Sequence, residues 1–338
     1  MASMPPRRDL LREQLHALAE LQKQPPPGRA DPGYAARQTL LRAALTGKSS
    51  FAAAAAADCL RDSDTELLAL LEPAFGRFLA EPLHSDKGCT AKTAIARALE
   101  RLDSTDDKVF RRGLFHTQPE PVFGGRQDTA VELRSVCALG LARLAPPDVL
   151  NLLAELLADP ERGARVAAVR ALGVTGQEGA GALLRFKALV GDEDSLVLTE
   201  GLSALLQLER TGALAFVQRF LDPQDEAHAD AAALALGQSR LPEAVPLLLE
   251  HAEAPPRSQR RTALLALSML REPAATEYLL GLVREAETRL AQLALEALGL
   301  HRYDAALRRR VIEVVAARRS PALQEALAKS FPEAPSAP

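Results

Sequence analysis

The chain has 338 residues, a net charge of −3, three cysteines and no tryptophan. Near-balanced charge gives no general sign of a nucleic acid or an anionic membrane as partner, and no apolar run reaches the roughly 18 residues of a membrane span. The cysteines, Cys59, Cys89 and Cys137, form no C-x-x-C pair, so we expect small core residues in a reducing, cytoplasmic protein.

Residues 1–32 predict an amphipathic helix followed by a proline-rich linker. Between Asp9 and Gln24, leucines recur on or near one face, and Asp9 suits the positive end of the helix. The run Pro25-Pro26-Pro27-Gly28 then ends it. Two roles stay open for this helix: it covers the first repeat of the body, or it docks on another chain.

Residues 33–130 predict degenerate helical repeats with a long inserted loop at 102–128. Glycines at 124 and 125 allow a tight turn in this loop, and insertions of this kind often bind partners. The alternative is that its phenylalanines only fix a long connection to the body. The candidate binding residues of the loop are Arg111, Arg112, His116, Glu120, Arg126 and Asp128.

Residues 131–318 repeat one short phrase six times. Ala-Leu followed by Gly, Leu or Ser begins at 138, 171, 204, 235, 266 and 297, with spacings of 33, 33, 31, 31 and 31 residues. Three positions before each phrase begins, the residue is small in every case, as close helix packing requires. A fixed period of this size marks a solenoid. A second helical stretch lies between phrases, and no strand signal is present.

The stretch from Asp159 to Gly173 resembles the inner helix of a HEAT repeat, especially the short bacterial form named after phycobilisome lyases. The resemblance covers residues 131–318 as six HEAT-like repeats. It implies an all-α fold, an α-solenoid of stacked helix pairs that forms a HEAT-like superhelix. It also places Arg165 and Asp159 at the positions of the family's inter-repeat arginine and aspartate. Residues 319–338 then form a C-terminal cap and a disordered tail.

Motifs for catalysis or for a metal do not emerge from the sequence. Gly47-Lys48-Ser49 lacks the first glycine of a P-loop, and no G-x-S-x-G elbow is present. The six histidines are scattered, and no two are spaced to make a metal-binding helix face. We therefore expect no enzyme, no cofactor and no metal site.

The sequence predicts a non-catalytic scaffold or adaptor that binds another protein along the concave face of the solenoid. One alternative is a bilin-lyase-like or other modification-helper protein. A second is a HEAT-type nucleic-acid-binding protein, because six arginines lie between residues 302 and 319. With no tryptophan to hold a base, we expect no nucleic-acid partner, and no membrane partner. The candidate binding residues on the inner helices are Arg134, Arg170, Glu200, Asp230 and Arg261.

Overall fold

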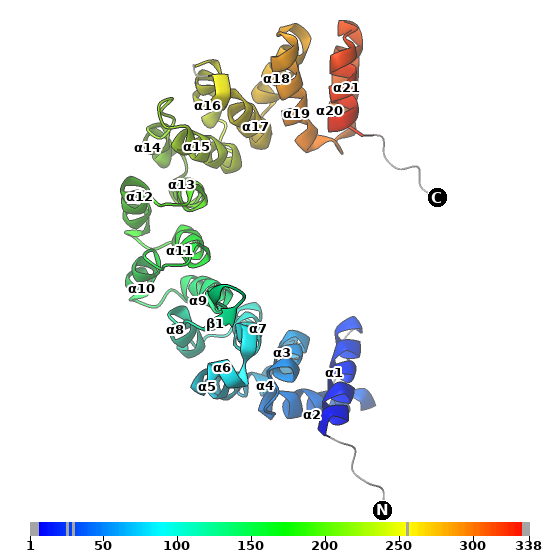
Figure 1. The fold of residues 1–338 in the computed structure, drawn as a ribbon, viewed down its shortest axis with the longest axis vertical. Coiled ribbons are helices and arrows are strands. Elements are labelled where there is room, and N and C mark those ends of the chain that lie inside the picture. Colours follow the sequence, from blue (N-terminus) through cyan, green and yellow to red (C-terminus); the bar gives the residue numbers. More distant parts are fainter. Residues whose placement is uncertain (1–6, 25–26, 29–30, 255–256, 333–338) are drawn as a thin grey trace, which may run out of the picture. The chain divides into compact units, whose positions relative to one another are not determined.

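The computed structural model describes residues 7–332, apart from 25–26, 29–30 and 255–256. This part of the chain consists of helices and one two-stranded hairpin, so the predicted all-α class is confirmed (Figure 1). Two compact units make up the chain, Met1–Ala171 and Leu172–Pro338, with the boundary inside α11 (Arg162–Val174). Each unit is a stack of helix pairs in two layers.

The first unit has one layer of helices that pack each on the next, and we call it the inner layer because α9 carries an Ala-Leu phrase. Its members are α1 (Arg7–Lys23), α3 (Ser50–Cys59), α7 (Thr90–Arg101) and α9 (Val131–Leu144). Against it pack α2 (Pro32–Thr46), α5 (Leu71–Ala80) and α8 (Lys108–Leu114). The unit also contains α10 (Val149–Leu156) and four short elements: η1 (Asp62–Asp64), α4 (Thr65–Leu68), α6 (Pro82–Ser85) and η2 (Lys87–Cys89).

The second unit repeats the arrangement more regularly. Its inner layer is α13 (Ser195–Glu209), α15 (Glu226–Ser239), α17 (Arg260–Leu270), α19 (Thr288–Leu298) and α21 (Pro321–Ser330). The outer layer is α12 (Ala180–Val190), α14 (Leu214–Gln218), α16 (Ala244–Glu253), α18 (Pro273–Glu285) and α20 (Ala305–Arg318). The connecting 3-10 helices are η3 (Arg210–Ala213), η4 (Arg257–Gln259) and η5 (Gly299–His301).

Two of the Ala-Leu-Gly phrases lie where one inner helix closely approaches the next. A Cβ on Gly237 would stand 2.7 Å from the backbone of Ala266 in the next inner helix, and one on Gly173 would stand 2.8 Å from the Cβ of Ala204. The small residue three positions before each phrase is also buried, as for Ala168 and Ala263. Larger side chains would push the helices apart. The small residues therefore recur at a fixed spacing because the backbones of neighbouring inner helices are in close contact there.

The two ends of the described chain are regular inner-layer helices. Helix α1 packs on α3 with Leu18 fully buried, and so covers the first helix pair. Within the segment predicted as a C-terminal cap, α21 packs on α19 and continues the inner layer. The predicted disordered tail, from residue 333 on, lies outside the described residues, as does part of the proline-rich linker at 25–30.

Residues 102–128 are not the long loop that we expected. They contain α8 and an antiparallel hairpin, β1 (Pro119–Val122) and β2 (Gly125–Asp128), in which Val122 pairs with Gly125. Helix α8 is fixed because Phe110 is fully buried with its ring against Gly140 of α9. The expectation of no strands is therefore wrong here. The strands are short and poor in β-branched residues, so the alternating pattern that identifies strands in a sequence is missing.

Candidate functional site

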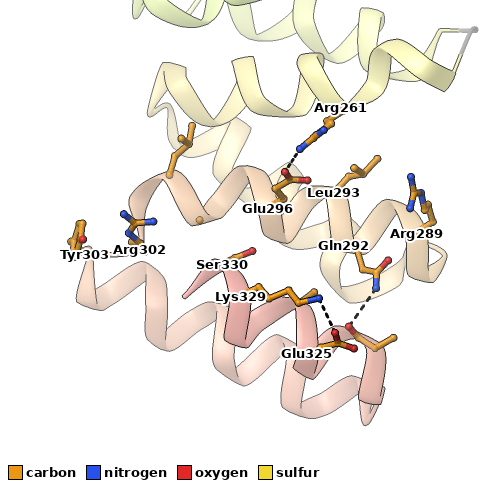
Figure 2. Close-up of a pocket in the computed structure, with 14 residues that line it drawn as sticks. Arg261, Arg289, Gln292, Leu293, Glu296, Arg302, Tyr303, Glu325, Lys329 and Ser330 are labelled. Carbon is orange, nitrogen blue, oxygen red and sulfur yellow. Dashed lines mark hydrogen bonds and ion pairs between the residues drawn. The ribbon is translucent and has the colours of Figure 1, made fainter. Parts of the chain in front are cut away.

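A hollow of about 800 Å³ opens on the inner layer of the second unit, between α19 and α21. Figure 2 shows that its side chains come mainly from α19 and α21, with Arg261 of α17 at one rim. Its lining combines four cations, two carboxylates, an amide and a few apolar groups. The lining residues are Arg261, Arg289, Gln292, Leu293, Glu296, Gly299, Leu300, Arg302, Tyr303, Ala322, Glu325, Ala326, Lys329 and Ser330.

The amphipathic pattern of α19 explains why these residues face the hollow. Ala291, Ala294, Leu295 and Leu298 are buried against neighbouring helices, which leaves Gln292 and Glu296 on the open side. Next to the hollow, the chain passes so close to α21 that a Cβ on Gly299 would stand 3.0 Å from the Cβ of Ser330. The side chain of Gln292 also donates a hydrogen bond to the carbonyl of Ala322, 3.4 Å away. The walls of the hollow are therefore tied to each other.

Both carboxylates of the hollow already have cationic partners. Glu296 pairs with Arg261 across two inner helices, and Glu325 pairs with Lys329 one turn away, at 2.7 Å. The hydrogen bond from Lys329 and the charge of its ammonium group hold the pKa of Glu325 below its ordinary value. Because both carboxylates are neutralised locally, any net charge in the hollow comes from the other cations.

Two arginines of the hollow have no acidic partner among the described residues, Arg289 and Arg302. Figure 2 places them at opposite ends of the hollow. The guanidinium of Arg302 lies 5.1 Å from the centre of the Tyr303 ring, which is a cation-π distance. The hollow thus has two free positive charges, with paired charges between them.

A second hollow of about 540 Å³ adjoins the first, and both are lined by Leu300 and Tyr303. These are exposed apolar residues, since 88% of Tyr303 and 50% of Leu300 is accessible. We call these two residues the ridge. In the second hollow, His301 Nε2 lies 2.8 Å from the carbonyl oxygen of Ser268. Asp304, which also lines the second hollow, caps α20 by accepting hydrogen bonds from two backbone amides. A chain lying across the ridge would therefore touch an aromatic ring and both hollows.

Of the predicted inner-helix residues, only Arg261 lines this site. Arg170 and Glu200 lie on α11 and α13, and each is engaged by other groups of the chain. Asp230 on α15 is half-buried. Arg134 is corrected most strongly: it is fully buried, and its guanidinium lies between Asp128, at 2.6 Å, and Asp159, at 2.9 Å. It cannot contact a partner without unfolding of this region.

The loop candidates mostly hold the first unit together. Arg111 makes a two-pronged ion pair with Asp148, with both distances 2.7 Å, and this raises the pKa of Arg111. Arg112 is exposed, with its guanidinium 5.8 Å from the ring centre of Phe75. These two arginines therefore fix α8 to its neighbours, a structural role that our alternative interpretation gave only to the phenylalanines.

His116, Glu120 and Asp128 fix the hairpin. Burial lowers the pKa of His116, whose carbonyl accepts a hydrogen bond from Arg134. Although burial by itself raises the pKa of Glu120, hydrogen bonds from Gln118, the Gly88 amide and Thr129 outweigh this and lower it. The side chain of Arg126, by contrast, is exposed and has no polar partner among the described residues.

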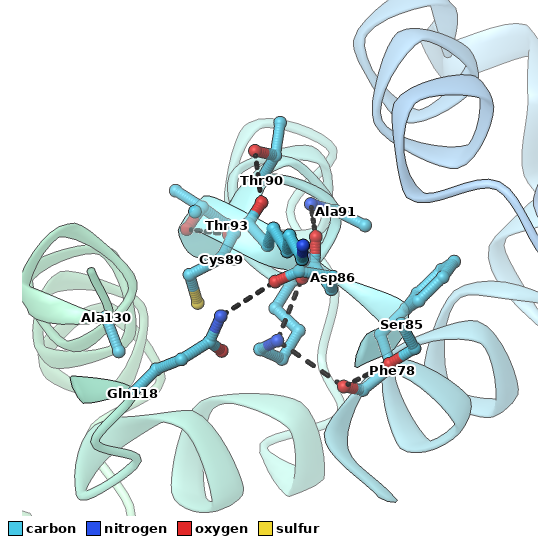
Figure 3. Close-up of polar contacts among 12 residues, drawn as sticks. Phe78, Ser85, Asp86, Cys89, Thr90, Ala91, Thr93, Gln118 and Ala130 are labelled. Atoms are coloured by element: carbon cyan, nitrogen blue, oxygen red, sulfur yellow. Dashed lines mark hydrogen bonds and ion pairs between the residues drawn. The ribbon is translucent and has the colours of Figure 1, made fainter. Parts of the chain in front are cut away.

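The hairpin rests on a buried ion pair that the sequence did not reveal. Lys92 and Asp86 are completely buried, with Lys92 Nζ 2.9 Å from Asp86 Oδ2. The Gln118 side chain donates a hydrogen bond to the Asp86 carbonyl, 2.7 Å away (Figure 3). Burial raises the pKa of the neighbouring Cys89 thiol to about 11. This thiol is therefore protonated at neutral pH and unreactive, as expected of a core cysteine.

The six arginines from 302 to 319 do not form a single basic surface. Arg310 pairs with Glu277 at 2.5 Å, and Arg318 donates hydrogen bonds to the carbonyls of Val283 and Ala286. Arg308 contacts the carbonyl of Pro332. What the sequence missed is the ridge of Leu300 and Tyr303, together with Arg289, Glu325 and Lys329. The only signal was an aromatic residue beside Arg302.

Among the described residues, no helix is both long and apolar enough to cross a membrane. The same part of the chain holds no group of three or more acidic, histidine or cysteine side chains suited to a metal ion.

A family model for HEAT repeats matches residues 125–205, 184–263 and 213–299. Together these matches span more than half of the chain, and the chain belongs to the HEAT-repeat family. HEAT repeats are protein-interaction modules. No curated protein matches the chain.

Solved structures with a similar arrangement of helices include the complex of CpcE and CpcF of phycocyanin lyase from a Nostoc species. It has 21% identity and a TM-score of 0.36, over 72% of this chain and 94% of that one. Human deoxyhypusine hydroxylase has 20% identity and a TM-score of 0.29, over 77% and 90%. An engineered protein has 17% identity and a TM-score of 0.36, over 98% and 97%.

These neighbours correct the prediction that the chain is not an enzyme. Two of them are named as a lyase and a hydroxylase, so an array of this kind is no ground for excluding catalysis. At this level of identity the likeness concerns the fold alone, and it assigns no reaction to the chain.

Proposed function

We propose that this HEAT-repeat protein is a scaffold or adaptor that binds a partner protein through the exposed side chains of its inner layer. The groove formed by the two hollows at α17, α19 and α21 is the main contact. One observation carries the proposal: the inner layer is hollowed where Leu300 and Tyr303 are exposed beside free arginines. Aromatic residues and arginines are the side chains most enriched where protein interfaces gain their energy.

The other candidate surface supports the proposal less well. Most charged residues around α8 and the hairpin are held by contacts within the unit, such as Arg111 with Asp148. Charges that are already paired and partly buried lose those partners if they turn to a ligand. The hairpin tip, with Phe123 and Arg126, stays available for contacts there.

We place this activity in the cytoplasm. Cys59, Cys89 and Cys137 are all free thiols buried in the helix stacks. Unpaired cysteines are typical of reducing compartments, whereas disulfides form in oxidising ones.

A matched pair of substitutions tests the proposed surface. The tagged full-length chain is expressed in its native cells, crosslinked and purified, and partners are quantified by mass spectrometry. We expect Leu300→Asp to remove the main partner, because it places a charge in the contact area. Leu189→Asp is the control, since Leu189 is similarly exposed but lies on outer helix α12. Loss with Leu189→Asp, or crosslinks confined to outer helices, would contradict binding through the inner layer.

A further inference from the structure

Building on the proposed function, we infer that the groove binds an extended, acidic segment of its partner, with an apolar side chain seated on the ridge of Leu300 and Tyr303. The argument starts from charge. Four cations and two carboxylates line the first hollow, and each carboxylate is already paired. The excess of positive charge resides on Arg289 and Arg302 and selects carboxylates from solution.

The positions of these two arginines set the spacing of the carboxylates. Arg289 lies in the first turn of α19 and Arg302 follows η5, so they are separated by roughly the length of α19, about 16 Å at 1.5 Å per residue. Figure 2 shows the hollow running between them. An extended chain advances about 3.3–3.6 Å per residue, so two acidic residues about five positions apart would reach both guanidinium groups.

The ridge sets the position of the apolar residue. Leu300 and Tyr303 stand next to Arg302 and border both hollows. An exposed ring gains from contact with another aromatic or aliphatic group, and its hydroxyl can stay in water. Beyond the ridge, the second hollow offers Arg271, which also has no acidic partner among the described residues. The apolar residue of the segment therefore lies next to the carboxylate that meets Arg302.

Size and geometry favour a peptide segment over a nucleic acid. The hollows, about 800 and 540 Å³, are each of the size of ligand pockets and have walls of closely packed helices. A phosphate backbone would meet Glu296, Glu325 and Glu277 along the same path, because their pairing does not remove them from the groove. A segment with only two carboxylates can avoid these groups.

Fluorescence anisotropy with defined peptides and the full-length chain tests the inference. The probe is a labelled peptide of about ten residues, long enough in extended form to span the groove. It has two acidic residues about five positions apart and a phenylalanine beside the second. One comparison peptide replaces both acids by their amides, and another replaces phenylalanine by alanine. A single-stranded and a duplex oligonucleotide of similar length complete the set.

We expect the amide peptide to bind at least about tenfold more weakly than the acidic one, and binding to weaken as salt rises. Arg289→Glu and Arg302→Glu should each weaken the acidic peptide about tenfold and leave the amide peptide unchanged. Tyr303→Ala should remove the advantage of phenylalanine over alanine. Arg309→Glu is the matched control: it makes the same charge change on an exposed arginine of α20 that lines neither hollow.

Several outcomes overturn the inference. They are equal binding of the acidic and amide peptides, equal losses for Arg289→Glu and Arg309→Glu, and tighter binding of an oligonucleotide that displaces the peptide. If the crosslinks of the native partner lie on inner helices but the peptides show no preference for acids, the inference fails and the proposed function stands. If the crosslinks lie on outer helices, the proposed function fails.

Discussion

Arg134 and Asp159 form an ion pair inside the first unit, with 2.9 Å between Nε and Oδ2 and the arginine side chain fully out of solvent. The same guanidinium also contacts Asp128 at the end of the hairpin. One arginine thus joins α9, the hairpin and the turn before α11. The residue that we first interpreted as a contact for a partner is a structural connection.

Replacing Arg134 by Met should destabilise the first unit by about 3–5 kcal/mol, because it leaves two largely buried carboxylates without their counter-charge. Thermal unfolding followed by circular dichroism measures the effect. Arg126→Met is the control, since Arg126 is exposed on the hairpin, and it should change the melting temperature very little. Equal melting of the two variants would mean that the pairs with Asp128 and Asp159 do not stabilise the fold.

Two glycines in the second unit should respond in opposite directions to alanine. Gly237→Ala should destabilise by about 1–3 kcal/mol, because the new Cβ meets the backbone of Ala266. Gly281→Ala should stabilise by about 0.5–1 kcal/mol, because it lies inside α18 with nothing within 4 Å of the new Cβ. Denaturant unfolding measures both. A stabilising Gly237→Ala would show that the inner helices are not in close contact there.

The phenylalanines of residues 102–128 should differ sharply. Phe110→Ala should cost about 3–5 kcal/mol, since that ring is fully buried against α9. Phe123→Ala should leave stability nearly unchanged, because Phe123 is fully exposed at the hairpin tip. Melting curves of the purified variants distinguish the two. A large loss with Phe123→Ala would mean that the tip packs on the body.

Stability of the second unit should fall as the pH drops below about 6.5, the ordinary pKa of histidine. Burial lowers the pKa of His251, which is 5% exposed, while the charge of Asp230 opposes the shift. Between the lowered pKa of His251 in the folded chain and pH 6.5, this histidine binds a proton more readily in the unfolded chain. Unfolding is therefore favoured as the pH falls through this range.

The free energy of unfolding of wild type and His251→Leu, measured from pH 7.5 to 5, checks this expectation. We expect a smaller loss in the variant, because the proton that favours the unfolded wild-type chain has no site there. Parallel curves for the two proteins would show that His251 is not responsible for the pH dependence.

The sequence predicted the inner layer because a backbone contact leaves a trace at a fixed period. Small residues such as alanine, glycine or serine are needed where helices such as α15 and α17 meet. Their regular spacing can therefore be recognised in the sequence. The candidate residues were harder to assign, because a charged side chain looks the same in a sequence whether it is solvated or paired. Arg111 and Asp148 are 37 positions apart, and only the fold brings them together. The exposure of Leu300 and Tyr303 could not be predicted either, because it depends on how the helices around them pack.

The location of the groove has a thermodynamic consequence. In a helical array each repeat is stabilised mainly by its neighbours, and within the described residues α21 has an inner-layer neighbour, α19, on one side only. The wall of the groove formed by α21 should therefore open locally more often than α15 or α17, and its amides should exchange with deuterium sooner. A segment bound between α19 and α21 contacts both helices and so adds contacts to α21. Binding in the groove should then slow the exchange of the α21 amides. The exchange rate of α21 therefore indicates whether the partner is bound.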